Sequence, residues 1–173
     1  MKISNTKKYL DLYNQEEFLF NIIGPAIRKR GFMKFDEFYR ICMWKSARQK
    51  PKYLHNKKII ESISKEAFAD KDEVGKIKKL CSLRGVGIPT ASAILTIVYP
   101  HKYGIIDIRC IEMLKKMGFD INKSINLKNW INYLEFVRTL GKENNLQPRE
   151  IDKVLFAMHR EMLENNNYKN LYK

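Results

Sequence analysis

The residues LRGVGIPTA, at positions 83–91, could bind a phosphate group. Gly85 and Gly87 have no Cβ, so the backbone there can take dihedral angles that are closed to other residues and can approach a ligand closely. Pro89 suits the first turn of a helix, where the neighbouring free N–H groups point outward. These donors and the positive end of the helix dipole together form an anion site. An ordinary tight corner between two helices, without a ligand, is the alternative interpretation.

A second stretch, YRICMWKSARQKPKYLHNKK at positions 39–58, combines cations with flat aromatic rings and contains no acidic residue. Cations such as Lys45 and Arg48 can neutralise phosphates. Aromatic rings can stack on an extruded base or fill the gap that it leaves. Tyr39 and Trp44 are therefore candidates for a base pocket, although the helical spacing of Tyr39 favours core packing for that residue. The lysines fit phosphate contacts or a solvated surface better than sequence reading.

Helices must position both stretches, because helical periodicity runs through nearly the whole chain and no alternating strand pattern competes with it. We expect one all-α domain, residues 1–173, as a compact bundle of about eight helices with short connections, including a helix-hairpin-helix motif. The ends, about 1–14 and 165–173, are expected to be loosely ordered. The helices are predicted at 15–30, 35–42, 57–68, 70–83, 89–98, 108–117, 127–140 and 148–163.

Local signals predict where some of these helices start, stop and bury their apolar side. Asp70 followed by Glu73 resembles a cap for the helix that reaches Leu83. Gly118 and Gly141 are expected to end two later helices. Helical spacing predicts buried faces that include Phe18, Ile22, Ile23 and Ile27 in one segment and Ile59, Ile60, Ile63 and Phe68 in another.

The charge of the chain favours a polyanionic partner, either nucleic acid or an anionic membrane. Lysine and arginine total 33 against 19 acidic residues, a net charge of +14. A lysine-rich solubilising surface is the alternative. The three cysteines are odd in number and far apart, which fits buried thiols in a reducing cytosol better than disulfides or a metal cluster. No long apolar run is present, so we expect a soluble, unexported, cytoplasmic protein.

The stretch KLCSLRGVGIPTASAILTIVYPHKYGIIDIR resembles the helix-hairpin-helix and aspartate loop of the helix-hairpin-helix GPD superfamily of DNA glycosylases. That family typically reads L-P-G-V-G-x-K-T-A through the hairpin, then an apolar helix, then a short loop that ends in V-D. Pro89 stands at the lysine position of the family, and Asp107 follows it by 18 residues, the spacing found in lysine-bearing members. The specific resemblance covers roughly residues 74–117.

The resemblance implies that Asp107 is the catalytic residue, beside the anomeric carbon of a flipped nucleotide, where a fixed carboxylate stabilises developing positive charge. The same aspartate is also a good N-cap for the helix after it, and the two roles can coexist. Pro89 has no amine for a Schiff base, so the expected enzyme is monofunctional, unless Lys45 or Lys102 supplies the amine. The implied DNA contacts are Arg84, Gly85, Val86, Gly87, Ile88 and Thr90 of the hairpin, together with Lys45 and Arg48.

The resemblance also sets expectations for cofactors and partners. No cysteine lies beyond Cys110, so no iron–sulfur cluster and no other metal site is expected, whereas a monovalent cation held by the hairpin is compatible with the family. The expected partner is double-stranded DNA, bound by a monomer without a further protein partner.

The sequence is compatible with three functions. The first is a DNA repair glycosylase that hydrolyses the bond to a damaged or mismatched base. The second is a non-catalytic DNA-binding protein that has kept the hairpin and lost the chemistry. The third is a helical domain that binds RNA or protein, which the hairpin favours less. The sequence does not indicate which base is excised.

Overall fold

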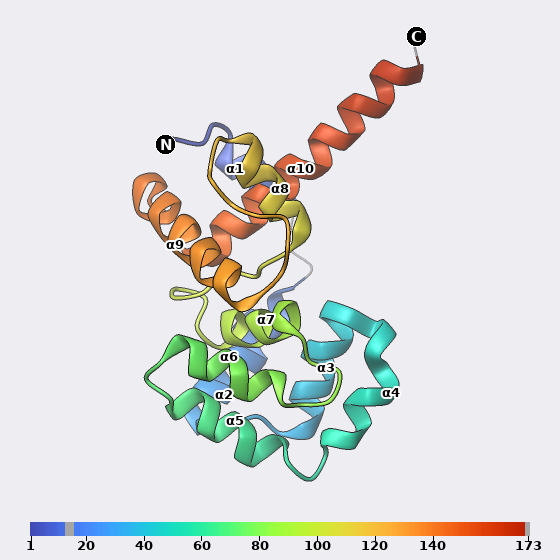
Figure 1. Ribbon diagram of the computed structural model, residues 1–173, viewed down its shortest axis with the longest axis vertical. Helices are drawn as coiled ribbons and strands as arrows, with labels where there is room; N and C mark the ends of the chain where they lie inside the picture. The colour runs from blue at the N-terminus through green and yellow to red at the C-terminus, as the bar shows by residue number, and fades with distance from the viewer. Residues whose placement is uncertain (13–15, 172–173) are drawn as a thin grey trace.

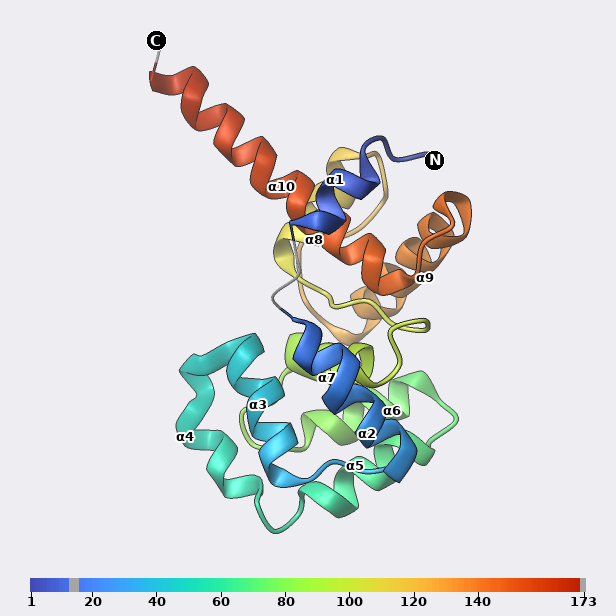
Figure 2. The ribbon, with the colours of Figure 1, turned by 180° about the vertical axis from the view of Figure 1, so that it is seen from behind.

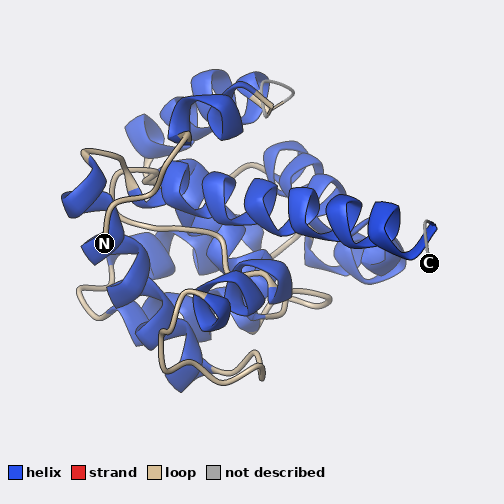
Figure 3. Ribbon diagram, turned by 90° about the horizontal axis from the view of Figure 1, so that it is seen from above, coloured by secondary structure: helices blue, strands red, loops and turns tan. Residues whose placement is uncertain are grey.

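The computed structural model describes residues 1–12 and 16–171, with side chains described up to residue 165. All regular structure in these ranges is helical and no strand occurs in them (Figure 3), so the predicted all-α fold class is confirmed. No helix in the described ranges is both long and apolar enough to cross a membrane.

The helices form two groups, one below the other in Figure 1, and the opposite view in Figure 2 shows the same division. The terminal group comprises α1 (Thr6–Asp11), α8 (Ile108–Lys116), α9 (Leu127–Asn144) and α10 (Pro148–Leu171). The middle group comprises a π-helical turn (Leu19–Ile23), α2 (Gly24–Arg30), α3 (Phe35–Ser46), α4 (Lys50–Tyr53), α5 (Ile60–Ala69), α6 (Glu73–Cys81) and α7 (Ile88–Val98), with short 3₁₀ turns at Ala47–Gln49 and Leu54–Asn56.

Helix α7 is the centre of the middle group. Its residues from Thr90 to Val98 are all buried, and it packs against α2, α3 and α6. Gly24 allows the close approach of α2, because a Cβ there would lie 2.2 Å from the carbonyl oxygen of Ile97. In the terminal group, α10 packs against α1, α8 and α9. One continuous cluster of buried side chains joins the groups, so they share a hydrophobic core.

The start of α6 differs from the prediction. Its N-cap is Asp72, whose carboxylate accepts hydrogen bonds from the N–H groups of Val74 (3.3 Å) and Gly75 (2.9 Å). Asp70 instead follows α5, accepts a hydrogen bond from the N–H of Asp72 and pairs with Lys79. Either aspartate is a suitable N-cap residue type, so the sequence alone does not distinguish them. The geometry of the turn places Asp72, the second of the two, at the N-cap position of α6.

Gly141 does not end α9, contrary to the prediction, because the helix continues to Asn144 and ends at Asn145, which takes a left-handed backbone (φ 56°). Gly141 lies inside the helix and is buried. A Cβ at this position would lie 2.6 Å from the carbonyl oxygen of Leu146, so the chain that folds back after α9 needs a glycine there. Gly118 does follow α8, with φ 91°.

Some predicted core positions are wrong. In the first segment the buried stripe is Leu19, Ile23 and Ile27, whereas Phe18 and Ile22 are exposed. Ile59 is also exposed, because α5 begins only at Ile60. At the chain ends, which we expected to be loosely ordered, Thr6–Asp11 forms α1 against α10, and α10 runs to Leu171. Residues 13–14 and 172–173 of those ends lie outside the described residues.

Candidate functional site

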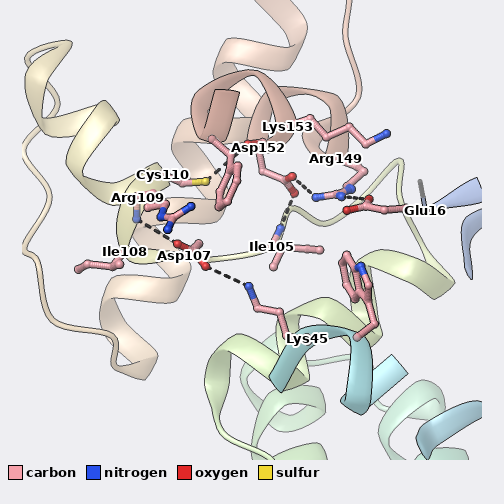
Figure 4. Close-up of a pocket in the computed structure, with 12 residues that line it drawn as sticks. Glu16, Lys45, Ile105, Asp107, Ile108, Arg109, Cys110, Arg149, Asp152 and Lys153 are labelled. Carbon is pink, nitrogen blue, oxygen red and sulfur yellow. Dashed lines mark hydrogen bonds and ion pairs between the residues drawn. The ribbon is translucent and has the colours of Figure 1, made fainter. Parts of the chain in front are cut away.

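A cavity of about 530 Å³ opens where the two helix groups meet, with walls from α3, the loop before α8, α8 itself and α10 (Figure 4). Its size lies within the range of roughly 300–1,000 Å³ that is usual for small-molecule sites. Both charged and apolar side chains line this cavity. The lining residues are Glu16, Trp44, Lys45, Ile105, Asp107, Ile108, Arg109, Cys110, Arg149, Asp152, Lys153 and Phe156.

Asp107 is the N-cap of α8 and also faces this cavity. Its Oδ1 accepts a hydrogen bond from the N–H of Arg109 at 3.1 Å, which satisfies one of the free donors at the start of the helix. Its Oδ2 accepts a hydrogen bond from the ammonium group of Lys45 at 3.1 Å. One carboxylate oxygen therefore serves the helix, and the other is turned towards the opposite wall of the cavity.

Lys45 reaches Asp107 from the last turn of α3, in the other helix group (Figure 4). The pair is partly shielded, with 16% of the Lys45 side chain and 27% of the Asp107 side chain exposed. Such shielding strengthens the attraction between the two charges relative to a fully exposed pair. The two residues lie 62 positions apart in sequence, so only the tertiary fold brings them together.

Three hydrogen bonds hold the loop that carries Asp107. The N–H of Ile105 donates to Asp152 (2.6 Å), and the Tyr133 hydroxyl donates to the carbonyl of Ile105 (3.0 Å). The N–H of Ile106 donates to the Ser92 hydroxyl (3.2 Å), which itself donates to the carbonyl of Pro89 (2.9 Å). The last two bonds tie the residue before Asp107 to the first turn of α7.

A buried charged network that the sequence did not predict lies on the α10 side of the cavity. Arg149 pairs with both Asp152 and Glu16 (Figure 4). Burial raises the pKa of Asp152 from 3.8 to about 6, although Arg149 and the Ile105 N–H favour the charged form. The sequence signal was an arginine and an aspartate three residues apart among the buried residues Ile151, Val154 and Leu155 of α10. Its importance lies in holding Ile105, two residues before Asp107.

In the turn between α6 and α7, residues 82–87, Gly85 takes a left-handed backbone, as predicted. Gly87, contrary to the prediction, has an ordinary extended backbone (φ −101°, ψ 177°) that other residues can adopt. Gly85 has φ 83°, and a Cβ on it would lie 3.0 Å from both Lys52 and Tyr53. The buried side chain of Asn56 braces the turn by accepting a hydrogen bond from the N–H of Arg84 (2.8 Å) and donating to the Arg84 carbonyl (2.9 Å). The turn therefore has a defined shape before any ligand arrives.

The residues predicted to contact DNA in this turn differ in accessibility. Arg84 and Gly87 are exposed and Gly85 and Ile88 are half-buried, whereas the side chains of Val86 and Thr90 are buried. The buried pair can shape the turn but cannot reach a ligand with their side chains. The free N–H groups at the start of α7 remain the donors through which this end of the helix could bind a phosphate.

The other predicted residues separate into two sets. Trp44 lines the cavity beside Lys45 and is 38% exposed, so a flat ligand could contact its ring. Tyr39 does not line the cavity; it packs on the core and its ring lies 5.9 Å from that of Phe35. Arg48 is exposed in the turn after α3, outside the cavity lining. The exposed basic residues that continue from Arg48 are Lys50, Lys52, Lys57 and Lys58.

The three cysteines are free, and Cys42 and Cys110 are buried. Burial raises the pKa of all three thiols, that of Cys81 to about 11, so none is activated as a thiolate nucleophile. Among the described residues, no group of three or more His, Cys, Asp or Glu side chains is placed to hold a metal ion.

Comparison with protein-family models, with curated proteins and with solved structures found no significant match.

Proposed function

We propose that this chain is a DNA N-glycosylase, which hydrolyses the bond between a damaged or mismatched base and its sugar, with Asp107 as the catalytic carboxylate. One observation carries the proposal: Asp107 presents one oxygen to the cavity while its loop is hydrogen-bonded to the first turn of α7, the helix that follows the glycine turn. The carboxylate and the glycine turn are thus parts of one hydrogen-bonded unit.

Duplex DNA would bind along the α6–α7 turn and the exposed basic residues that follow α3. The turn offers backbone N–H groups at the start of α7, and residues Arg48 to Lys58 add cations on neighbouring elements without an intervening acid. Both features contact phosphates irrespective of base sequence. A nucleotide rotated out of the helix would then enter the adjacent cavity, as enzymes that act on bases require.

The reaction depends on where charge develops. As the C1′–N bond breaks, its electron pair leaves with the base and the sugar becomes an oxocarbenium-like cation. A carboxylate fixed beside C1′ stabilises that cation, and it can take the proton of the water that adds to C1′. Trp44 and Phe156 provide apolar cavity wall against which a flat base could lie.

We further propose that the protein acts as a monomer in a reducing cytoplasm. The support for the compartment is that Cys42, Cys81 and Cys110 are all free thiols, two of them buried.

The test uses end-labelled duplexes that carry uracil, hypoxanthine, 8-oxoguanine, alkylated purines, or a T·G or A·G mismatch. Each reaction is analysed with and without alkali, which cuts the strand at an abasic site. We expect strand breaks on at least one lesion after alkali. Binding without product on every lesion would instead support a non-catalytic DNA-binding protein, and a preference for RNA would support the RNA-binding alternative.

Asp107→Asn is the decisive variant, because asparagine is as good an N-cap as aspartate and keeps α8 capped while removing the charge. We expect the rate of base release to fall by about 10²- to 10³-fold, as for loss of one transition-state electrostatic contact. Asp72→Asn is the matched control, since it makes the same change at the N-cap of α6, outside the cavity. It should release base at the wild-type rate.

A further inference from the structure

The cavity contains a buried arginine on its α10 side. Arg149 lines the cavity, and only 8% of this residue is exposed. Figure 4 shows it between Glu16 and Asp152, with Ile105 between this cluster and Asp107. In the proposed reaction the sugar lies at Asp107, so the base of an extruded nucleotide can extend towards Arg149.

The guanidinium group of Arg149 is held in place but has donors to spare. Its Nη1 donates to Asp152 and its Nη2 donates to Glu16, while its central carbon lies 4.9 Å from the ring centroid of Phe20. A guanidinium has five N–H donors, and these two bonds use only two of them. Its Nε–H has no hydrogen-bond partner among the described residues. Buried N–H groups are nearly always hydrogen-bonded in proteins, so an open one indicates a place for an acceptor that arrives with a ligand.

We propose that Arg149 determines which class of base the chain accepts, because its free N–H groups donate to a carbonyl oxygen of the extruded base. The substrates are then bases that carry a carbonyl group, such as hypoxanthine or uracil, and not bases that carry an amino group in its place, such as adenine or cytosine. This inference rests on the proposed function and adds the substrate class to it.

An arginine can discriminate between these bases because it only donates hydrogen bonds. A carbonyl oxygen accepts from the guanidinium, whereas an amino group would bring N–H against N–H and leave buried donors unpaired, which costs free energy. The guanidinium cannot easily turn away, since Asp152 and Glu16 both hold it. A site built around one hydrogen bond to the substrate rejects analogues that cannot make this bond more strongly than an apolar wall does.

The two carboxylates beside Arg149 are the competing groups, because a carboxylate would accept a hydrogen bond from an amino group. Oδ1 of Asp152 pairs with Arg149, and Oδ2 accepts from the N–H of Ile105 at 2.6 Å. Oε2 of Glu16 also pairs with Arg149. Three of the four carboxylate oxygens are therefore engaged within the protein, which favours the donors of Arg149 as the groups that meet the base.

The experiment compares single-turnover base release by the full chain from two series of duplexes, with the same opposing base within each series. The first series carries hypoxanthine, adenine or purine, which have an oxygen, an amino group or a hydrogen at C6. The second carries uracil or cytosine, which have an oxygen or an amino group at C4. We expect the base with the oxygen to be released about 10- to 100-fold faster than its analogues in at least one series, as for one hydrogen bond to a charged group.

Arg149→Lys is the variant that tests the residue itself. It keeps a cation between the two carboxylates but lacks the planar group and its Nε–H. We expect the ratio of the rates for hypoxanthine and adenine, or for uracil and cytosine, to fall about 10-fold or more. Both rates come from the same sample, so a loss of folded protein cancels in the ratio. Arg138→Lys makes the same change in an arginine that pairs with Glu73 outside the cavity, and it should keep the wild-type ratio.

Duplexes with 2′-fluoroarabino nucleotides, which resist hydrolysis of the base, give the same comparison as a binding affinity in wild type and variant. Tighter binding of hypoxanthine or uracil without any base release would keep the role of Arg149 and reject the glycosylase. Release of the amino or unsubstituted bases at an equal or greater rate, or an unchanged ratio in Arg149→Lys, would overturn the inference and leave the glycosylase standing. An absence of preference in both rate and affinity would also overturn it.

Discussion

Replacing Asp152 by asparagine tests the buried network that holds the loop before Asp107. The substitution keeps the shape of the side chain and an oxygen that can accept the hydrogen bond from the Ile105 N–H. It removes the negative charge that faces Arg149, while Glu16 still pairs with that arginine. The variant therefore isolates the titration of one buried carboxyl group.

The size of the effect follows from the pKa. Asp152 titrates at 3.8 when unfolded and at about 6 in the folded protein. Between these values the folded state holds a proton that the unfolded state has lost, so the contribution of this group to the free energy of unfolding falls as the pH rises. A shift of about two units at roughly 1.4 kcal/mol each amounts to about 3 kcal/mol, lost between about pH 4 and pH 7.

Urea unfolding followed by circular dichroism measures this directly. Carboxyl groups with lowered pKa values, such as Glu73 and Glu112, stabilise the fold as the pH rises, but they are present in both proteins and cancel in the difference. We expect the stability of the wild type relative to Asp152→Asn to decline by about 3 kcal/mol from about pH 4 to pH 7. A constant difference, or one that changes in the opposite direction, would show that folding does not raise the pKa of Asp152.

Three further variants test the glycine turn and the basic surface. Gly85→Ala strains a positive φ and brings a Cβ against Tyr53, so we expect the free energy of unfolding, measured by thermal denaturation, to fall by about 1–3 kcal/mol. We also expect weaker DNA binding, measured by fluorescence anisotropy. Asn56→Ala leaves the N–H and carbonyl of Arg84 without their bonds and should cost about 1–3 kcal/mol, measured in the same way. Arg48→Gln should leave stability unchanged and reduce the slope of log affinity against log salt by about 0.9; an unchanged slope would place Arg48 outside the interface.

The parts of the fold that could be predicted from sequence are those governed by local signals. Strong apolar periodicity predicted α7, and Pro89 and Gly85 predicted where it starts and how the preceding turn is built. Local signals were insufficient where several residues could serve the same purpose, as with Asp70 and Asp72 at the start of α6. They also failed at Gly141, whose role is to admit the returning backbone at Leu146.

The candidate site was predictable only in part, because its geometry is tertiary. Asp107 and Trp44 were named from sequence and do line the cavity, as does Lys45, yet nothing local indicated that Lys45 would contact Asp107 across 62 positions. The network of Glu16, Arg149 and Asp152 combines residues from opposite ends of the chain. The position of Tyr39 in the sequence was compatible with either a pocket residue or a core residue. The structure places it against the core.

In the proposed function, Asp107 performs chemistry on DNA as well as capping α8. The most direct measurement compares wild type and Asp107→Asn on the lesion that the panel identifies, recording single-turnover base release and DNA affinity on the same samples. We predict that release falls by about 10²-fold or more while affinity stays the same, because the charge acts only where the sugar becomes positive. Equal rates of release in the two proteins would contradict the mechanism.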